Sequence, residues 1–417
     1  MKRLFQFVAI AVAGLVAAQP ALAGLLCAAP ASACPVAMTD MGPGCPMAGR
    51  MAADNCPLTA YLRAMPQSLA SVASPARPKV ESPAGAQSST FVLPTVVGSL
   101  LASHSLALPD ETDEQGRTIE ECVSFTGGQT WGPIATADVY LAGEIAVNVP
   151  VQVMDDTNAS APPPAACGAN GTLINSVAAF GANGVLGVGV FAQDCGDACV
   201  SPAAPLPVYY GCSAAGTCSA ENVALAQQVS SVVTQFAADN NGVIINLPNL
   251  VNANGDASVQ GELIFGLSTQ ADNMLPASGL IVLGADAKGD FTATYNGAAS
   301  VLPALIDSGT DAYSFNDSSI AVCSTGAFVG YYCPAVAPAT AFAVNTGVGP
   351  YTASNTVNFA IADPNTFVVG ASAYTGLAGG GGSTSFTWGM PFFYGRKVYV
   401  GIDQRVSGAY SGPFYAY

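Results

Sequence analysis

One short stretch of the sequence contains the residues best suited to acid–base chemistry. Residues 304–310 read Ala-Leu-Ile-Asp-Ser-Gly-Thr, so two apolar residues lead into Asp307, and Ser308, Gly309 and Thr310 follow it. This order is typical of a buried strand that ends in a tight turn, where small hydroxyl groups hydrogen-bond the carboxylate. Two such carboxylates that share one proton can activate a water molecule. The spacing therefore marks Asp307 as a catalytic-type residue, supported by the three residues that follow it.

The sequence does not repeat this motif in its first half. Five aspartates of this half do not combine two preceding apolar residues with a following Ser/Thr-Gly in the way that Asp307 does: Asp110, Asp113, Asp138, Asp155 and Asp156. One carboxylate cannot both activate the attacking water as a base and protonate the leaving group as an acid. General acid–base help is worth roughly 10²- to 10⁴-fold per group. A chain with half of the pair is therefore expected to have little hydrolytic activity.

The N-terminal residues have the order of a secretory signal. Lys2 and Arg3 precede an apolar run over 4–18, and Ala21-Leu22-Ala23 supplies a small-x-small cleavage pattern, so residues 1–23 are expected to be a signal peptide. No other stretch is apolar and long enough to span a bilayer. We therefore expect an exported protein that is periplasmic, outer-surface or secreted, without a membrane span.

Export favours disulfides among the twelve cysteines. Spacing does not fix the connectivity, but three pairs are close neighbours in the sequence and one would be a longer link. The predicted pairs are Cys195/Cys199, Cys212/Cys218, Cys323/Cys333 and, as the longer link, Cys122/Cys167.

Charge divides the chain into two unlike parts. Residues 1–90 hold six basic and three acidic side chains, whereas residues 91–417 hold five basic and twenty-four acidic ones. So few cations exclude nucleic acid as a partner, because phosphate contacts need Lys and Arg. The acidity indicates either solubility or use at low pH. Residues 24–90 are rich in Ala, Pro and Met and are expected to be a low-complexity, disordered segment.

The segment 24–90 also contains a short repeat. Cys34-Pro35, Cys45-Pro46 and Cys56-Pro57 recur every eleven residues among several methionines, which are ligands suited to Cu(I). A flexible tail with incidental cysteines is the favoured interpretation. We predict no metal and no other cofactor.

From residue 91 onward the pattern indicates strands. Residues 139–154 predict a hairpin that turns at Ala142-Gly143, and five shorter segments read as further strands: 244–247, 261–265, 280–283, 291–295 and 397–402. One helix is expected over 220–236, capped by Ser219, with an apolar stripe that includes Val229, Val233 and Phe236. Many short strands with one or two helices predict an all-β fold.

The order of these segments resembles that of pepsin-like aspartic peptidases. Residues 123–132 resemble the flap hairpin that closes over substrate, although Phe125 stands where that family has Tyr. Residues 184–189, 261–266 and 388–393 match further anchors in the same order. The resemblance implies a bilobal, pepsin-like acid protease fold with an N-terminal lobe over 91–255 and a C-terminal lobe over 256–417. It also implies substrate contacts from the flap-like hairpin 123–141, at Phe125, Gly127, Gly128 and Trp131.

A narrower resemblance is to a bacterial exported family catalogued as domain of unknown function 3443. The stretches that carry it are 121–133, 184–199, 239–244, 386–396 and 412–417. This resemblance implies a fold and no established activity. The chain departs from the pepsin pattern at 91–101, where the first Asp-Thr-Gly is expected and no Asp occurs, so the first lobe is incomplete.

Three hypotheses remain open. In the first, the chain is a catalytically inactive relative that binds a peptide or glycan between its lobes or serves structurally. In the second, it is an acid endopeptidase whose second Asp is not placed. In the third, residues 1–99 reflect a frameshift or rearrangement of the coding sequence. The first hypothesis is preferred for the chain as it stands. A peptide or polypeptide is the expected ligand, and a monomer is the expected state.

Overall fold

The computed structural model describes most of the chain from residue 108 onward. Gaps in this description fall at 126–127, 155–161, 168–172, 174, 176–183, 202–204, 253, 258 and 381–383. Before residue 108 it describes four short strands, β1 (Arg50–Met51), β2 (Tyr61–Arg63), β3 (Phe91–Val92) and β4 (Ser99–Leu101). The Cys-Pro repeat and the predicted signal peptide lie outside the described residues.

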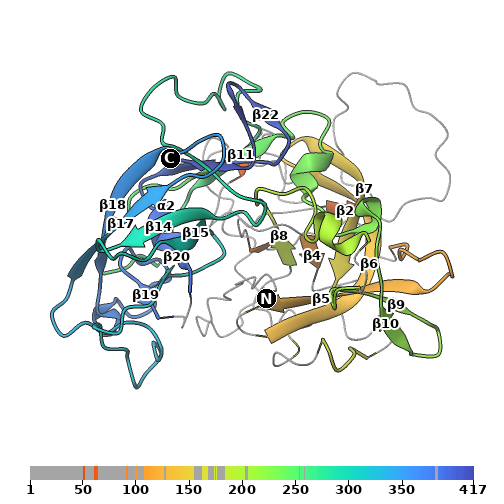
Figure 1. Cartoon of the computed structure of the whole chain (residues 1–417), viewed down its shortest axis with the longest axis horizontal. Helices are drawn as coiled ribbons and strands as arrows, with labels where there is room; N and C mark the ends of the chain where they lie inside the picture. Colours follow the sequence, from red (N-terminus) through yellow and green to blue (C-terminus); the bar gives the residue numbers. More distant parts are fainter. Residues whose placement is uncertain are drawn as a thin grey trace, which may run out of the picture.

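Strands dominate the described residues, and the prediction of an all-β fold is confirmed. The nine-stranded sheet, at the right of Figure 1, has the order β10-β9-β5-β6-β7-β4-β8-β3, with β2 paired to β6. Its remaining strands are β5 (Thr118–Phe125), β6 (Gly128–Leu141), β7 (Glu144–Val153), β8 (Gly184–Leu186), β9 (Tyr209–Cys212) and β10 (Cys218–Ala220).

A seven-stranded sheet lies at the left of Figure 1, in the order β18-β17-β14-β15-β20-β16-β19. Its strands are β14 (Phe291–Tyr295), β15 (Leu302–Ile306), β16 (Tyr313–Ser314), β17 (Ala339–Thr346), β18 (Ser354–Ile361), β19 (Ala378–Gly379) and β20 (Phe386–Trp388).

A third sheet has six strands in the order β1-β12-β11-β21-β24-β13. Its strands beyond β1 are β11 (Gly242–Asn246), β12 (Glu262–Phe265), β13 (Val282–Gly284), β21 (Lys397–Gly401) and β24 (Phe414–Ala416). A two-stranded hairpin joins β22 (Val406–Ser407) to β23 (Tyr410–Ser411). The short helices are η2 (Gly196–Cys199), η3 (Leu225–Gln227), η4 (Val232–Gln235), η5 (Pro364–Thr366) and α2 (Met390–Phe393).

One apolar core connects the three sheets. It contains fully buried side chains from the nine-stranded sheet (Val149), the six-stranded sheet (Leu263) and the seven-stranded sheet (Phe291 and Phe386). Burial of this apolar surface is the main favourable term that holds the two sides of the molecule together.

The structure confirms the predicted strands and hairpin but not the predicted helix. Residues 220–236 contain two 3₁₀ turns separated by extended backbone. The backbone N–H groups of Val229 and Ser231 donate to the Tyr209 hydroxyl and the Ala192 carbonyl, so they are not available for helical bonds. Val229, Val233 and Phe236 are still buried, whereas Ser219 lies in β10 and contacts Arg117.

The four predicted disulfides are confirmed. The structure contains Cys122–Cys167, Cys195–Cys199, Cys212–Cys218 and Cys323–Cys333.

Candidate functional site

Asp307 directly follows β15, a partly buried strand of the seven-stranded sheet. Strand β15 runs parallel to β20, with Ile306 opposite Trp388, and the Asp307 N–H donates to the Trp388 carbonyl at 2.9 Å. Asp307 is only 2 % exposed, and Ser308 and Thr310 are also buried. The Asp-Ser-Gly-Thr turn is therefore an internal turn that the sheet holds in place.

Both carboxylate oxygens of Asp307 accept hydrogen bonds from its own turn. The Thr310 hydroxyl donates to Oδ2 at 2.6 Å, and the Gly309 N–H donates to Oδ1 at 3.0 Å. Charge-assisted bonds of this kind fix the orientation of a carboxylate. The sequence pattern predicts hydrogen bonds from the Ser308 and Thr310 hydroxyls; the Thr310 bond is present, and the Gly309 N–H donates as well.

The segment that follows β20, at the start of helix α2, supports this turn. The Met390 N–H donates to the Thr310 carbonyl at 2.6 Å. A Cβ on Gly389 would lie 2.1 Å from the Ala312 carbonyl oxygen and 2.6 Å from that of Thr310, so only glycine fits against this backbone. Trp388 is fully buried and its indole N–H donates to Asn345 at 3.0 Å. The turn is therefore held by close packing as well as by its hydrogen bonds.

A tyrosine and a second aspartate lie near the turn, and sequence reasoning missed both. Burial raises the pKa of Tyr415, and the charge of Asp307 raises it further, so the phenol is neutral. Asp311 follows Thr310 directly and accepts a hydrogen bond from the Tyr331 hydroxyl. Burial raises the pKa of Asp311, and among the described residues no group donates to its buried Oδ1. The adjacency of Asp311 to the motif was the one available signal in the sequence.

The flap-like hairpin is present as β5 and β6, with Phe125 paired to Gly128 and Cys122 to Trp131. Trp131 is 1 % exposed; its ring packs on Tyr210, and its backbone exchanges two hydrogen bonds with the Asn175 side chain. Gly128 is also buried, whereas Gly127 and the Phe125 side chain lie outside the described residues. The structure thus brings Trp131 into the core of the hairpin and not to an open surface.

The nine-stranded sheet repeats the strand arrangement around Asp307. In the seven-stranded sheet, β20 pairs with β15 in parallel and with β16 in antiparallel orientation. In the nine-stranded sheet, β8 pairs with β3 in parallel and with β4 in antiparallel orientation. Residues 91–101, which include β3 and β4, contain no Asp.

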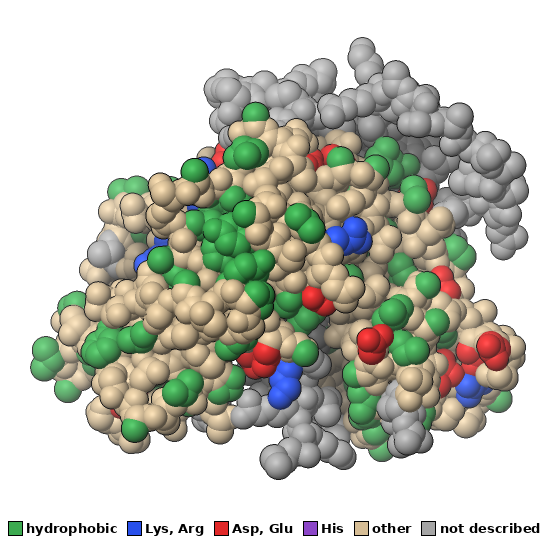
Figure 2. Space-filling model, turned by 45° about the horizontal axis from the view of Figure 1, so that its top comes forward, with side chains coloured by type: hydrophobic (Ala, Val, Ile, Leu, Met, Phe, Trp, Pro, Cys, Tyr) green, Lys and Arg blue, Asp and Glu red, His purple; other side chains and the backbone are tan. Residues whose placement is uncertain are grey.

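Other kinds of site find little support in the described part of the chain. No group of three or more His, Cys, Asp or Glu residues there could hold a metal ion. No helix in that part is long and apolar enough to cross a membrane. On the face shown in Figure 2, basic side chains are few and separated, which agrees with the low count of Lys and Arg.

Comparisons with known proteins identify a family and include a solved structure of low sequence identity. Residues 95–417 match the model of a family described as protein of unknown function (DUF3443). A search of curated sequences finds no significant match. A crystal structure of an aspartic proteinase from Irpex lacteus has 13 % sequence identity and a TM-score of 0.46, and the match covers 79 % of this chain and 90 % of that one.

Proposed function

Since this chain belongs to that family of proteins of unknown function, we propose its role from the Asp307 turn: it binds an extended polypeptide there and does not hydrolyse it efficiently. The proposal assigns Asp307 the role of hydrogen-bond acceptor for a ligand N–H or O–H. Thr310 and Gly309 would hold the carboxylate in place, and the β5–β6 hairpin would cover the ligand.

One observation carries the proposal. Strand β8 pairs with β3 and β4 as β20 pairs with β15 and β16, and residues 91–101, which include β3 and β4, contain no Asp that could share a proton with Asp307. Hydrolysis by a carboxylate pair needs one member as base and the other as acid. A turn that keeps one buried carboxylate and its donors therefore supports binding better than catalysis.

The proposal is tested on the mature protein with two probes at pH 4 and pH 7. The first probe is a fluorescent peptide that contains statine, whose secondary hydroxyl can donate to Asp307. The second is an unfolded, carboxymethylated polypeptide, followed for both binding and cleavage. We expect saturable binding without cleavage, and at least a tenfold weaker affinity in Asp307→Asn.

The matched control is Asp197→Asn, because Asp197 is an exposed carboxylate on η2. It should bind as the wild type does. Absence of binding to both probes, or equal binding by wild type and Asp307→Asn, would overturn the proposal.

A second candidate function is acid endopeptidase activity, and Asp311 is the observation that favours it. The pKa of Asp311 is raised, and its buried Oδ1 accepts no hydrogen bond from the described residues. A carboxyl group with these properties can stay protonated at a pH above its ordinary pKa. This candidate predicts cleavage of the unfolded polypeptide at pH 3–5 that is lost in both Asp307→Asn and Asp311→Asn. Cleavage lost in neither variant would point to a contaminating peptidase.

We further propose that the protein is exported and acts as a monomer outside the cytoplasm. Four disulfides are consistent with this location, because they persist in oxidising compartments. Recovery of the reduced protein from the cytoplasmic fraction only would contradict it.

A further inference from the structure

A strand of the β5–β6 hairpin carries a glutamate into the interior of the nine-stranded sheet. Glu121 is 0 % exposed, and its backbone carbonyl accepts a hydrogen bond from the Gln152 side chain at 2.7 Å. Gln152 is itself fixed by the Thr130 hydroxyl at 2.8 Å. The main chain at Glu121 is thus held in place, and its carboxyl group cannot turn out to water.

The group that lies against this carboxyl is another carboxyl. Asp194, from the segment after β8, is within hydrogen-bonding contact of Glu121, and the Tyr209 hydroxyl of β9 lies beside both. Tyr209 is fully buried. In the described part of the chain, no Lys, Arg or His is among the groups that act on Glu121 or Asp194, so no cation neutralises the pair.

The hydrogen bonds around Glu121, Asp194 and Tyr209 leave the contact between the two carboxyl groups without a hydrogen atom to explain it. The Val229 N–H donates to the Tyr209 oxygen at 2.8 Å, and Tyr209 gives its single hydrogen to Asp194 Oδ1 at 2.7 Å. Within the described residues, no N–H or O–H group donates to either oxygen of Glu121. Two ionised carboxylates have no hydrogen to exchange and repel each other, so their contact needs one proton.

We propose that Glu121 and Asp194 share one proton, and that this proton fastens the β5–β6 hairpin to residues 190–195. The attachment matters because residues 190–195 also contact the C-terminal part of the chain: the Asp403 N–H donates to the Val190 carbonyl at 2.6 Å. Loss of the proton would leave two negative charges in contact, one of them fully buried, and the hairpin would separate from that segment. The proposal does not depend on the function assigned to Asp307.

The direction of the pH effect follows from which state holds the proton. Burial raises the pKa of Glu121 well above its ordinary 4.5, and the Asp194 charge raises it further; burial also raises the pKa of Asp194. Between pH 4.5 and the raised value the folded protein holds a proton that the unfolded chain releases. Stability is therefore full below about pH 4.5 and falls as pH rises through the pKa of the folded state. Each such proton changes the folding equilibrium by about tenfold per pH unit.

The test compares wild type with Glu121→Gln and Asp194→Asn. Each amide can donate the missing hydrogen bond without a titrating proton, and each is close to isosteric. Each protein is unfolded in urea at pH 4.5, 6 and 8. We expect the unfolding constant of the wild type to rise with pH more steeply than that of either variant. The expected difference between the slopes is about tenfold per pH unit. Glu114→Gln, at an exposed glutamate, is the matched control and should keep the wild-type slope.

Other acids that titrate between pH 4.5 and pH 8, such as Glu221, are present in the wild type and in each variant. Their effects therefore cancel when the pH slopes of two proteins are subtracted. Hydrogen exchange, corrected for the intrinsic rate, should show protection of β5 and β6 falling between pH 5 and pH 8 while β17 and β18 keep theirs. Equal slopes in wild type and in whichever amide variant folds would overturn the proposal, and so would equal loss of protection in both strand pairs.

Discussion

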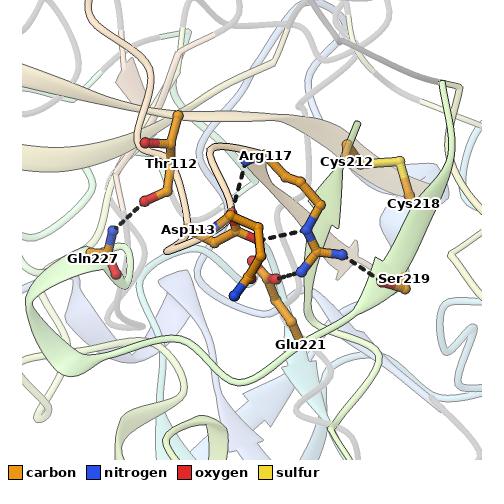
Figure 3. A network of polar contacts seen from close by, with 9 residues as sticks. Thr112, Asp113, Arg117, Cys212, Cys218, Ser219, Glu221 and Gln227 are labelled. Carbon is orange, nitrogen blue, oxygen red and sulfur yellow. Dashed lines mark hydrogen bonds and ion pairs between the residues drawn. A yellow bond between two sulfur atoms is a disulfide. The ribbon is translucent and has the colours of Figure 1, made fainter. Parts of the chain in front are cut away.

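Arg117 lies between two carboxylates at the edge of the nine-stranded sheet, and replacing it with Met should destabilise the protein more at pH 8 than at pH 5. Its guanidinium contacts Asp113 and Glu221, each at 2.6 Å, and donates to Ser219 at 3.0 Å (Figure 3). A Cβ on Gly211 would fall 2.3 Å from the Glu221 carboxylate and 2.6 Å from the guanidinium, so the pair lies directly on the backbone of β9.

The magnitude follows from burial and protonation. Burial raises the pKa of Glu221 to about 7, and the Asp113 charge adds to this, whereas Arg117 lowers it. Hydrogen bonds to charged groups are worth about 1.5–3 kcal/mol when buried. The Arg117 side chain is 30 % exposed and each carboxylate side chain 11 %, so solvent screening reduces this value. We expect a loss of about 2 kcal/mol at pH 8 and about 1 kcal/mol at pH 5.

The difference between the two pH values has a definite sign. Without Arg117 the pKa of Glu221 in the folded protein rises further above its ordinary value, and a carboxyl with a raised pKa loses stability as pH rises through that pKa. At pH 5 Glu221 is already protonated, so the change leaves no repulsion with Asp113. The ionised pair at pH 8 does repel.

Urea unfolding of four proteins tests this reasoning: wild type, Arg117→Met, Arg117→Met with Glu221→Gln, and the control Lys288→Met, at an exposed cation. The double variant should recover most of the extra loss at pH 8, because the amide removes the repulsion. The reasoning would be refuted if Arg117→Met lost the same stability at both pH values, or if Glu221→Gln gave no recovery.

Two further changes test other parts of the structure. Gly389→Ala places a methyl group 2.1 Å from the Ala312 carbonyl oxygen. We therefore expect about 1–3 kcal/mol of destabilisation in thermal unfolding and weaker binding of the statine peptide. Unchanged binding would show that the Asp307 turn does not depend on this packing. Cys122→Ser with Cys167→Ser opens a link between residues 45 positions apart, so we expect a loss of about 4 kcal/mol in urea unfolding; a loss below about 1 kcal/mol would contradict the loop-entropy argument.

Local patterns in the sequence were sufficient to predict much of the fold. The strands around Ile244, Phe291 and Val398 alternate or run as β-branched residues between Gly- and Asn-rich turns, and the structure contains them. The Asp307 turn could also be predicted, because its donors are two and three residues away along the chain. Short-range features of this kind depend on chemistry that a single stretch of sequence contains.

Two other features depend on distant partners and could not be predicted. The stripe of Val229, Val233 and Phe236 satisfies a helical period, yet the backbone N–H of Val229 donates to Tyr209 and not to its own segment. Glu121 appears in the sequence as an ordinary charged residue, and only the approach of Asp194 and Tyr209 gives it a role. Periodicity cannot reveal either outcome, since both are decided by which segments meet in three dimensions.

The same distinction between local and long-range features applies to Asp307 and to its expected counterpart in the first half of the chain. Asp307 is identified by its own turn, whereas the strand arrangement that its counterpart would share is visible only in the pairing of β8 with β3 and β4. The sequence over 91–101, which includes β3 and β4, contains no Asp. The strand arrangement is therefore present without a second carboxylate in that stretch of sequence, and this is why binding is proposed ahead of hydrolysis.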